Sequence, residues 1–339
     1  MKFNINELKK DIARLLKLHG LPEEQATTAA DCYVTADACG IKTHGLLVLQ
    51  SHLNKIDNGF YNLAPNLKLE KCTHSFAVVD SDNSIGTFSA VYCMNLAMQN
   101  AKKEGVFTVF AKNCNTYGPA FYYTKLAADE NLIGITCCNT PAAMAPWGSY
   151  EKLIGTNPFA AGIPGRKEGP VLLDFATSKV AKSKINQARL AGEKIPDNWA
   201  LDMNGNVTTD PIEAIKGVVL PMADYKGYGI ALVIDMLSGL LSGAAYANGV
   251  NKFYTEDGKP MNVGQLFVAI DPRIVLSEAF YKGVDEYINK IHSCKTANGT
   301  PPLYPGERKM QNYKHALENG IDYSDSQAGK LLTILKEIQ

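Results

Sequence analysis

The sequence predicts a mixed α/β fold in which a small helical domain accompanies a larger domain built on a mixed β-sheet. The first seventy residues repeat apolar side chains at helical spacing. From residue 76 to residue 138, short apolar runs rich in β-branched residues alternate with helical patterns. A further apolar run, residues 263–270, predicts a late strand. We expect residues 1–72 with 290–339 to form the helical domain and residues 73–289 the α/β domain.

Composition and charge exclude several classes of protein. The chain has 339 residues, enough for two or three domains, and its 46% hydrophobic and 20% charged residues are typical of soluble globular proteins. Thirty-four basic residues balance thirty-four acidic ones, so the net charge is zero. No overall field would attract a nucleic acid or an anionic membrane. We therefore expect a small-molecule substrate, with no nucleic-acid or membrane partner.

The N-terminal segment and the cysteines indicate a cytoplasmic protein. The first twenty residues mix charges and lack the apolar core of a signal peptide. The eight cysteines are scattered and contain no C-x-x-C pair. This pattern is typical of reduced thiols, and it lacks the ligand spacing of a zinc site. We expect no metal.

The helical domain is predicted from capping residues and apolar periodicity. Asn4 can cap a helix over residues 5–19, and a second helix is expected over residues 22–38, ended by Gly40. A third helical pattern begins at His44. His44 therefore lies on a connection between helices.

The region that follows alternates between the two periodicities. Strands are expected at residues 76–80, 106–110 and 132–138, and helices at residues 87–103 and 119–129. This order predicts a mixed α/β region with a sheet at its centre.

Two later helix starts could face a ligand. A strand over residues 171–175 precedes a helix over about 179–191 that Thr177 or Ser178 could cap. Free N–H groups at such a start can hold an anion, although an ordinary strand–turn–helix fits the pattern equally and is more frequent. Lys226 opens a second, apolar helix, where a cation either faces solvent or meets an anionic ligand.

His44 is the strongest candidate for proton transfer. It lies between Thr43 and Gly45. An imidazole titrates near pH ~6.5, so it can donate or accept a proton at cellular pH. A histidine on a polar turn is more often structural, so the assignment depends on the rest of the chain.

Several common motifs are missing from the sequence. No G-x-G-x-x-G follows a strand, and no G-x-x-x-x-G-K-[ST] occurs, so Rossmann and P-loop nucleotide sites are unsupported. The absence of G-x-S-x-G removes the common serine-hydrolase interpretation.

A set of short segments, spread over nearly the whole chain, resembles one known family in content and order. The segments are Thr43-His44-Gly45, the Ala-Pro-Trp-Gly of 145–148, Gly155-Thr-Asn-Pro158, Leu173-Asp-Phe-Ala-Thr-Ser178, the Lys-Gly-Tyr-Gly of 226–229, Gly264-Gln265 and Pro305-Gly-Glu307. They resemble the malate/L-lactate dehydrogenase family, which is distinct from the Rossmann-type enzymes and also contains sulfolactate, ureidoglycolate and diketogulonate oxidoreductases and cyclic-imine reductases.

The resemblance implies an NAD(P)-dependent oxidoreductase with a non-Rossmann cofactor domain, usually a homodimer. It would interconvert a small 2-oxo acid and its 2-hydroxy acid, with hydride from the nicotinamide and the proton from His44. NAD is the expected cofactor, and NADP stays open. The same chemistry suits an imidazole, because the imidazolium can protonate a carbonyl oxygen and the neutral ring can serve the reverse oxidation.

The resemblance also assigns roles to other residues. The expected cofactor contacts are Asn139, Thr140, Asn157, Asp174, Phe175, Ala176, Thr177, Ser178, Tyr225, Lys226, Pro305, Gly306 and Glu307. The residues expected to lie at the substrate are Thr43, Val48, Thr116, Tyr117 and Lys259.

Three positions depart from the family pattern. Val48 replaces an arginine, Thr116 replaces a second histidine, and Met261, with Lys259 nearby, replaces another arginine. Arginine binds carboxylates through two hydrogen bonds, so its loss is not conservative. We therefore expect a substrate smaller or less anionic than a dicarboxylate. The alternatives are a cyclic-imine carboxylate or diketo-acid reductase, or a pseudoenzyme that binds the cofactor without catalysis.

Overall fold

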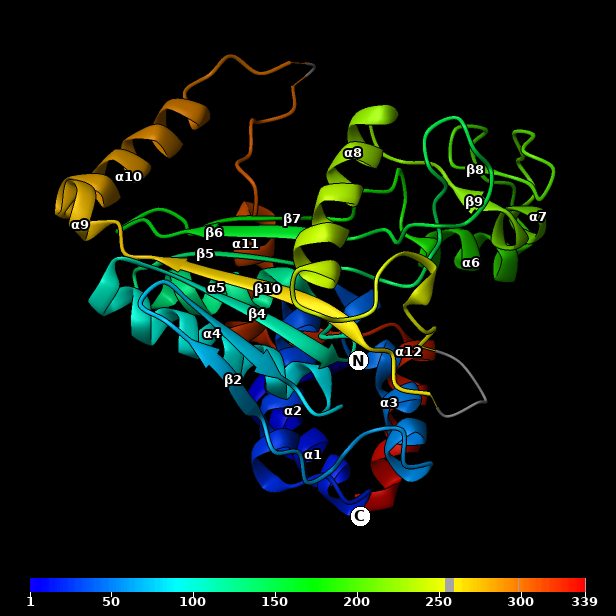
Figure 1. The fold of residues 1–339 in the computed structure, drawn as a ribbon, viewed down its shortest axis with the longest axis horizontal. Coiled ribbons are helices and arrows are strands. Elements are labelled where there is room, and N and C mark those ends of the chain that lie inside the picture. Colours follow the sequence, from blue (N-terminus) through cyan, green and yellow to red (C-terminus); the bar gives the residue numbers. More distant parts are fainter. Residues whose placement is uncertain (254–258, 298, 339) are drawn as a thin grey trace.

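The computed structural model describes residues 1–253, 259–297 and 299–338, and its centre is a seven-stranded sheet (Figure 1). The strands are β2 (Lys68–Cys72), β3 (Phe76–Asp80), β4 (Val106–Cys114), β5 (Ile133–Cys138), β6 (Phe159–Ile163), β7 (Val171–Phe175) and β10 (Val263–Ile270). Their order is β2-β3-β4-β10-β5-β6-β7. Only β3 and β4 pair in parallel; the other neighbours are antiparallel. This sheet confirms the predicted mixed α/β class.

Helices cover both faces of the sheet. Figure 1 shows α4 (Gly86–Glu104) and α5 (Ala120–Asp129) beneath it and α8 (Tyr225–Ile234) above it. A π-helical segment, η3 (Asp235–Leu240), continues α8 and contacts β10. The main core lies between the sheet and α4 and α5, where alternate residues of β4 are buried against helical alanines. This alternation is expected for a strand with one face on a core.

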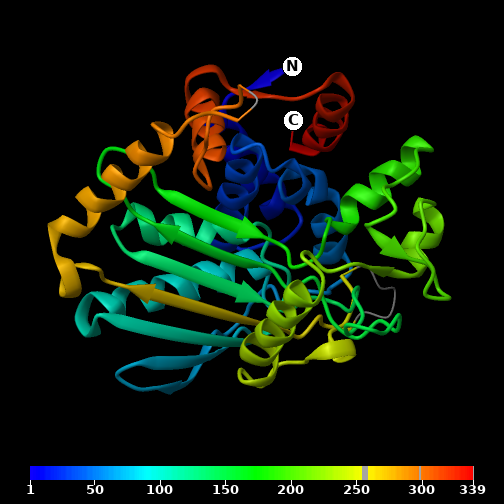
Figure 2. The same ribbon diagram turned by 90° about the horizontal axis from the view of Figure 1, so that it is seen from above.

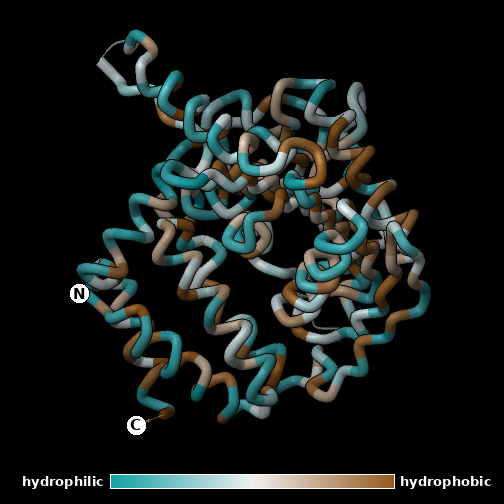
Figure 3. The backbone as a smooth tube through the Cα atoms, turned by 90° about the vertical axis from the view of Figure 1, so that its left-hand side faces the viewer, coloured by the Kyte–Doolittle hydropathy of each residue, from teal (hydrophilic) through white to brown (hydrophobic). Residues whose placement is uncertain are grey.

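The N-terminal and C-terminal segments form one helical unit beside the sheet. Its elements are β1 (Lys2–Phe3), α1 (Ile5–Leu18), α2 (Glu23–Ala38), α3 (Leu49–Asp57), α11 (Glu307–Asn319), β11 (Ile321–Asp322), α12 (Asp325–Leu335) and η5 (Lys336–Ile338). β1 pairs with β11, and both termini lie on the same side of the molecule (Figures 2 and 3). The Asn4 carboxamide accepts hydrogen bonds from the N–H groups of Asn6 and Glu7, which confirms the predicted cap.

A smaller unit lies at the edge of the sheet near β7. It contains α6 (Lys182–Ala191), β8 (Ala200–Leu201), α7 (Pro211–Lys216) and β9 (Val218–Val219), with a core of its own. The elements that complete the chain are η1 (Lys42–His44), η2 (Leu46–Val48), η4 (Ala247–Gly249), α9 (Arg273–Leu276) and α10 (Glu278–His292). Throughout the described ranges, every helix is too short or too polar to cross a lipid bilayer.

Two predicted elements differ from the structure. The helix expected from His44 is interrupted: two short 3₁₀ turns, η1 and η2, precede α3, because Gly45 (φ −101°, ψ −135°) leaves helical geometry. The cap predicted for the helix over residues 179–191, Thr177 or Ser178, is wrong. This helix, α6, begins at Lys182, and its N-cap is Ala181, whose side chain cannot accept a hydrogen bond. Ser178 instead donates its hydroxyl to the Val180 carbonyl at 2.9 Å.

Candidate active site

A cavity of about 320 Å³ lies at one edge of the central sheet. The ends of β4, β5 and β7 and the beginning of β10 meet at this edge, because β10 runs antiparallel to β4 and β5. The connection after α2 and the start of α6 complete the wall. The predicted site residues that line the cavity are Thr43, His44, Thr116, Tyr117, Asn139, Thr140 and Ala176.

His44 ends the turn η1 and presents its imidazole to this cavity. The Thr43 hydroxyl lies 3.1 Å from His44 Nδ1, so a neighbour along the chain fixes the ring. The His44 side chain is exposed to solvent, and the protein groups packed around it partly desolvate the ring. This desolvation lowers the pKa of His44 below its ordinary value of 6.5, while the carboxylate of Asp174 acts in the opposite direction.

Asp174, at the end of β7, is held in place by the backbone of α5. Its Oδ2 accepts a hydrogen bond from the Phe121 N–H at 3.1 Å. Burial raises the pKa of the Asp174 carboxyl, and the Lys309 ammonium and the His44 imidazole lower it. The resemblance placed Asp174 only in a cofactor segment. The structure adds an electrostatic coupling to His44, which favours the imidazolium.

Two buried asparagines hold the backbone here: Asn139 lines the cavity, and Asn157 lies between the lining residues Thr156 and Pro158. The Asn139 amide donates to Asp235 Oδ1 at 2.8 Å and to the Ala245 carbonyl at 2.7 Å, and its oxygen accepts from the Gly264 N–H at 2.9 Å. Asn157 Oδ1 accepts from the Thr140 N–H at 3.0 Å. Both side chains therefore fix the backbone around the cavity, since their hydrogen-bonding groups are occupied within the protein.

Ring stacking and hydrogen bonds hold the turn that carries Thr116 and Tyr117. The Tyr117 ring stacks on Tyr123 with centroids 4.8 Å apart, and the Tyr123 hydroxyl donates to the Tyr117 carbonyl. Gln265 donates to the Asn115 carbonyl at 2.9 Å, which ties the Gly264-Gln265 motif to this turn. Tyr117 therefore contributes mainly to the core, and the side chain of Thr116 is left at the cavity.

Several predicted residues lie elsewhere. The described residues that line the cavity do not include Val48, Asn157, Asp174, Phe175, Thr177, Ser178, Tyr225, Lys226, Lys259, Pro305, Gly306 or Glu307. Phe175 is the last residue of β7, Ala176 follows it and does line the cavity, and Thr177 and Ser178 come next in the chain. Tyr225 and Lys226 open α8, with Tyr225 exposed beside Trp147 at a centroid distance of 6.4 Å.

The segment Pro305–Glu307 packs against β7. The Pro305 carbonyl accepts from the Leu172 N–H at 2.8 Å, and the Glu307 carboxylate contacts His292 at 3.0 Å. Gly306 has φ +92°, and a Cβ there would collide with Leu172. This segment therefore supports the strand that carries Asp174.

Sequence reasoning missed part of the cavity wall. Ala181, Lys182 and Ser183 line the cavity from the start of α6, together with Phe253. Burial and the neighbouring Lys252 lower the pKa of Lys182. Lys182 could have been identified from its position at the start of a helix, two residues after the apolar Val180. The wrong cap assignment placed the helix start at an earlier residue. Met261, noted in the sequence as a departure, is buried in the same wall.

Comparison with known proteins gives one consistent result. The family model for malate/L-lactate dehydrogenase matches residues 3–332. The chain is 37% identical to L-sulfolactate dehydrogenase of Methanocaldococcus jannaschii over 331 residues, 97% of this chain and 95% of that protein. It is 33% identical to ureidoglycolate dehydrogenase (NAD(+)) of Escherichia coli O157:H7 over 327 residues, covering 96% and 93% of the two chains.

The fold agrees with a solved structure of the same kind. The structure of the sulfolactate dehydrogenase from Methanocaldococcus jannaschii matches with a TM-score of 0.90 and 36% sequence identity. The match covers 99% of this chain and 97% of that chain. The similarity therefore extends over the sheet, the helical unit and the cavity between them.

Proposed function

The chain belongs to the malate/L-lactate dehydrogenase family, and from that premise we propose that it interconverts a small 2-oxo acid and its 2-hydroxy acid with NAD(H) or NADP(H). It is an oxidoreductase, as its dehydrogenase relatives are. The observation that carries the proposal is the placement of His44 in a cavity at the sheet edge, with its ring next to the Thr43 hydroxyl and under the electrostatic influence of Asp174.

The residues at the cavity fit a nicotinamide dinucleotide. The start of α6 contributes N–H groups, which suit a phosphate. The Thr177 hydroxyl, next to Ala176, is buried without a hydrogen-bond partner in the described part of the chain. These residues would hold the dinucleotide, and the cavity would take its nicotinamide ring with a small acid. When bound, the nicotinamide supplies the hydride that reduces the substrate carbon.

His44 supplies the other half of the reduction. As hydride reaches the carbonyl carbon, negative charge develops on the oxygen, and the imidazolium donates its proton there. In the oxidation, the neutral imidazole accepts the hydroxyl proton. The Asp174 carboxylate stabilises the charged ring in either direction. The Thr43 contact at Nδ1 orients the ring, so that Nε2 is the nitrogen expected to exchange the proton.

Lys182 and the missing arginines support a monocarboxylate substrate. Among the described residues of the cavity wall, Lys182 is the basic side chain other than His44. Val48 does not line the cavity, and Met261 adds an apolar surface. A dicarboxylate held without an arginine would leave a buried charge poorly paired, at a cost on the order of 2–5 kcal/mol. A single carboxylate can be balanced by Lys182.

The test is the oxidation of NADH and NADPH at 340 nm with a panel of substrates. The panel contains short 2-oxo monocarboxylates, oxaloacetate, diketo acids and cyclic imine carboxylates. We expect the highest kcat/KM with a 2-oxo monocarboxylate. Preference for oxaloacetate would contradict the substrate class, and preference for a cyclic imine would assign the reaction to C=N reduction. Cofactor binding without turnover of any compound would indicate a pseudoenzyme.

A further inference from the structure

We propose that Asp37 is a positioning residue for His44, because its carboxylate fixes the segment from His44 to Leu46 against the C-terminal part of the chain. The inference rests on the proposed role of His44. Asp37 lies near the end of α2, seven residues before His44, and is 97% buried. It lies outside the cavity wall and would act through the backbone.

Two hydrogen bonds join three distant segments at one carboxylate oxygen. Asp37 Oδ2 accepts from the Leu46 N–H at 3.2 Å and from the Tyr323 hydroxyl at 2.5 Å. Leu46 is the second residue after His44, and Tyr323 follows the strand β11. The carboxylate thus connects the end of α2, the turn that carries His44 and the segment before α12. Bonds to a charged acceptor are about twice as strong as neutral ones.

The other carboxylate oxygen lies directly beneath Gly45. A Cβ at Gly45 would overlap Asp37 Oδ1 and would approach the Tyr33 carbonyl to 2.9 Å. The glycine therefore lets the backbone rest on the carboxylate, with His44 as its immediate neighbour. This contact explains the glycine of the Thr43-His44-Gly45 motif, since a residue without a side chain leaves space for the Asp37 carboxylate.

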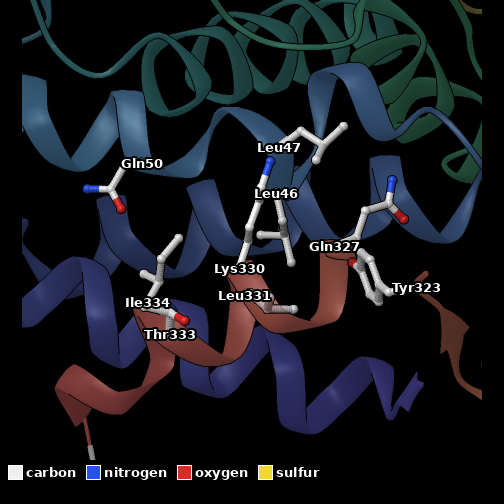
Figure 4. Close-up of a pocket in the computed structure, with 9 residues that line it drawn as sticks. All are labelled: Leu46, Leu47, Gln50, Tyr323, Gln327, Lys330, Leu331, Thr333 and Ile334. Carbon is white, nitrogen blue, oxygen red and sulfur yellow. The ribbon is translucent and has the colours of Figure 1, made fainter. Parts of the chain in front are cut away.

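The outer side of the segment is held by the same C-terminal elements. Lys42 Nζ donates to the Asp322 carbonyl at 2.5 Å and lies 4.7 Å from the centre of the Tyr323 ring. Figure 4 shows Leu46 above and Tyr323 at one end of a cavity of about 350 Å³ whose floor is α12. The turns η1 and η2 are only three residues each, so these tertiary contacts determine their position.

A carboxylate at this position lowers the stability of the folded protein. Burial raises the pKa of Asp37 to about 6, and Oδ1 has no hydrogen-bond partner among the described groups. A buried acceptor left unpaired is destabilising. An acid kept here despite that cost is consistent with a role in holding the catalytic turn.

The chain offers a matched pair of variants for the test. Tyr323→Phe removes one hydroxyl bond to Asp37. Tyr122→Phe removes a chemically equivalent bond, from the Tyr122 hydroxyl to Asp31 Oδ2 at 2.5 Å, earlier in the same helix α2. We expect kcat to fall about tenfold in Tyr323→Phe with an unchanged KM for the nicotinamide cofactor, because a displaced catalytic group lowers the rate of the chemical step. Tyr122→Phe should keep the wild-type kcat and show a similar shift in Tm.

Hydrogen–deuterium exchange gives a readout that does not depend on activity. Peptides containing Leu46 should exchange faster in Tyr323→Phe and in Asp37→Ala than in the wild type or Tyr122→Phe. Asp37→Asn, which keeps an acceptor oxygen, should restore part of the protection and part of kcat. If Asp37→Ala fails to fold, the two tyrosine variants decide the question.

Two results would overturn the inference. One is unchanged protection of the Leu46 amide in Tyr323→Phe together with wild-type kcat. The other is an equal loss of kcat in both tyrosine variants, which would indicate general destabilisation. Wild-type activity in His44→Ala would instead refute the proposed function, and the exchange data would still report whether Asp37 holds the turn.

Discussion

The imidazole of His44 experiences two opposing influences on its pKa. Desolvation by the surrounding protein groups disfavours the charged ring, and the Asp174 carboxylate favours it. Desolvation dominates, so the pKa of His44 lies below 6.5 and the ring is mostly neutral at pH 7. The neutral form is the base needed for oxidation, and the small charged fraction is the acid needed for reduction.

The sign of this pKa shift predicts opposite pH profiles for the two directions. The kcat/KM for oxidation should stay constant as the pH falls from 8 towards 6.5 and decrease only below the lowered pKa of His44. The value for reduction should decrease as the pH rises through the same pKa. Asp174→Asn removes the charge that raises the pKa of His44, so the pH at which each of the two kcat/KM values changes should move lower. A movement to higher pH would contradict the assigned coupling.

Lys182 should affect substrate binding more than the chemical step. In Lys182→Met, the KM for the acid substrate should rise about tenfold or more with little change in kcat, because a cation that binds the carboxylate acts in the ground state and the transition state alike. Lys184→Met is the matched control, since Lys184 is exposed on the same helix and is not among the described cavity residues. An equal rise in substrate KM in the two variants would indicate that long-range electrostatic attraction, rather than direct contact with Lys182, binds the carboxylate.

At this scale, local pattern predicted some site residues and missed others. Thr43, His44, Thr116 and Thr140 were found because their motifs lie on turns that the structure brings to the cavity. Lys182 was missed because a lysine at the start of an exposed helix is usually solvated. No feature of the α2 pattern distinguishes the buried Asp37 from an exposed acid, since its partner Tyr323 lies 286 positions away.

At the scale of elements, Asn139 connects three parts of the fold at the cavity edge. Its side chain joins the end of β5 to the π-helical segment η3, to Ala245 and to the start of β10. Gly239 and Gly264 allow this close approach, because a Cβ at either position would collide with a neighbouring group. The cavity wall therefore depends on one amide.

Removing that amide should destabilise the protein. Asn139→Ala leaves the Asp235 carboxylate, one carbonyl and one N–H without this partner, so we expect a loss of about 2–4 kcal/mol in the free energy of unfolding. Urea denaturation measures it. Asn100→Ala, which removes one bond to the Leu96 carbonyl within α4, should cost about 1 kcal/mol or less. A comparable loss in both variants would argue against the role assigned to Asn139.

The elements that the sequence predicted are those with strong local patterns. The strands β3, β5, β7 and β10 and the helices α1, α2, α4 and α5 follow from apolar periodicity and capping. β2 was missed because its residues are exposed and largely charged, and β6 because it contains two alanines and a glycine. Their strand conformation comes from pairing within the sheet, which no local window reports.

At the scale of the whole molecule, α8 and η3 expose an apolar face to solvent. Its residues recur every three or four positions, with two adjacent pairs, and each is at least 38% exposed: Ile230, Val233, Met236, Leu237, Leu240 and Leu241. Monomeric proteins seldom expose contiguous apolar surfaces of this kind. The face supports our expectation of a homodimer, in which a second copy would cover it.

Charge placed on this face should separate the subunits. Val233→Glu or Leu240→Glu should convert a dimer into a monomer in analytical ultracentrifugation, because burying an unpaired carboxylate in an interface is strongly unfavourable. Leu190→Glu is the control, since Leu190 is 71% exposed on α6, away from this face. A wild-type protein that sediments as a monomer would refute the proposed dimer.

The sheet order shows where prediction from sequence stops. The pattern predicted a strand at residues 263–270, and the structure inserts it as β10 between β4 and β5. That insertion brings Met261 and Val263 to His44 and creates the cavity. Pairing across more than a hundred residues depends on the complete core, so the family resemblance, rather than local pattern, indicated that these segments share one site.

The most direct test of the account compares His44→Ala with the wild type on the best 2-oxo acid substrate. We expect His44→Ala to bind NADH or NADPH as tightly as the wild type, measured by fluorescence titration, and to lose at least a hundredfold in kcat, in line with the usual contribution of general acid–base catalysis. A variant that binds the cofactor and retains the wild-type kcat would show that another group transfers the proton, and the central claim would be wrong.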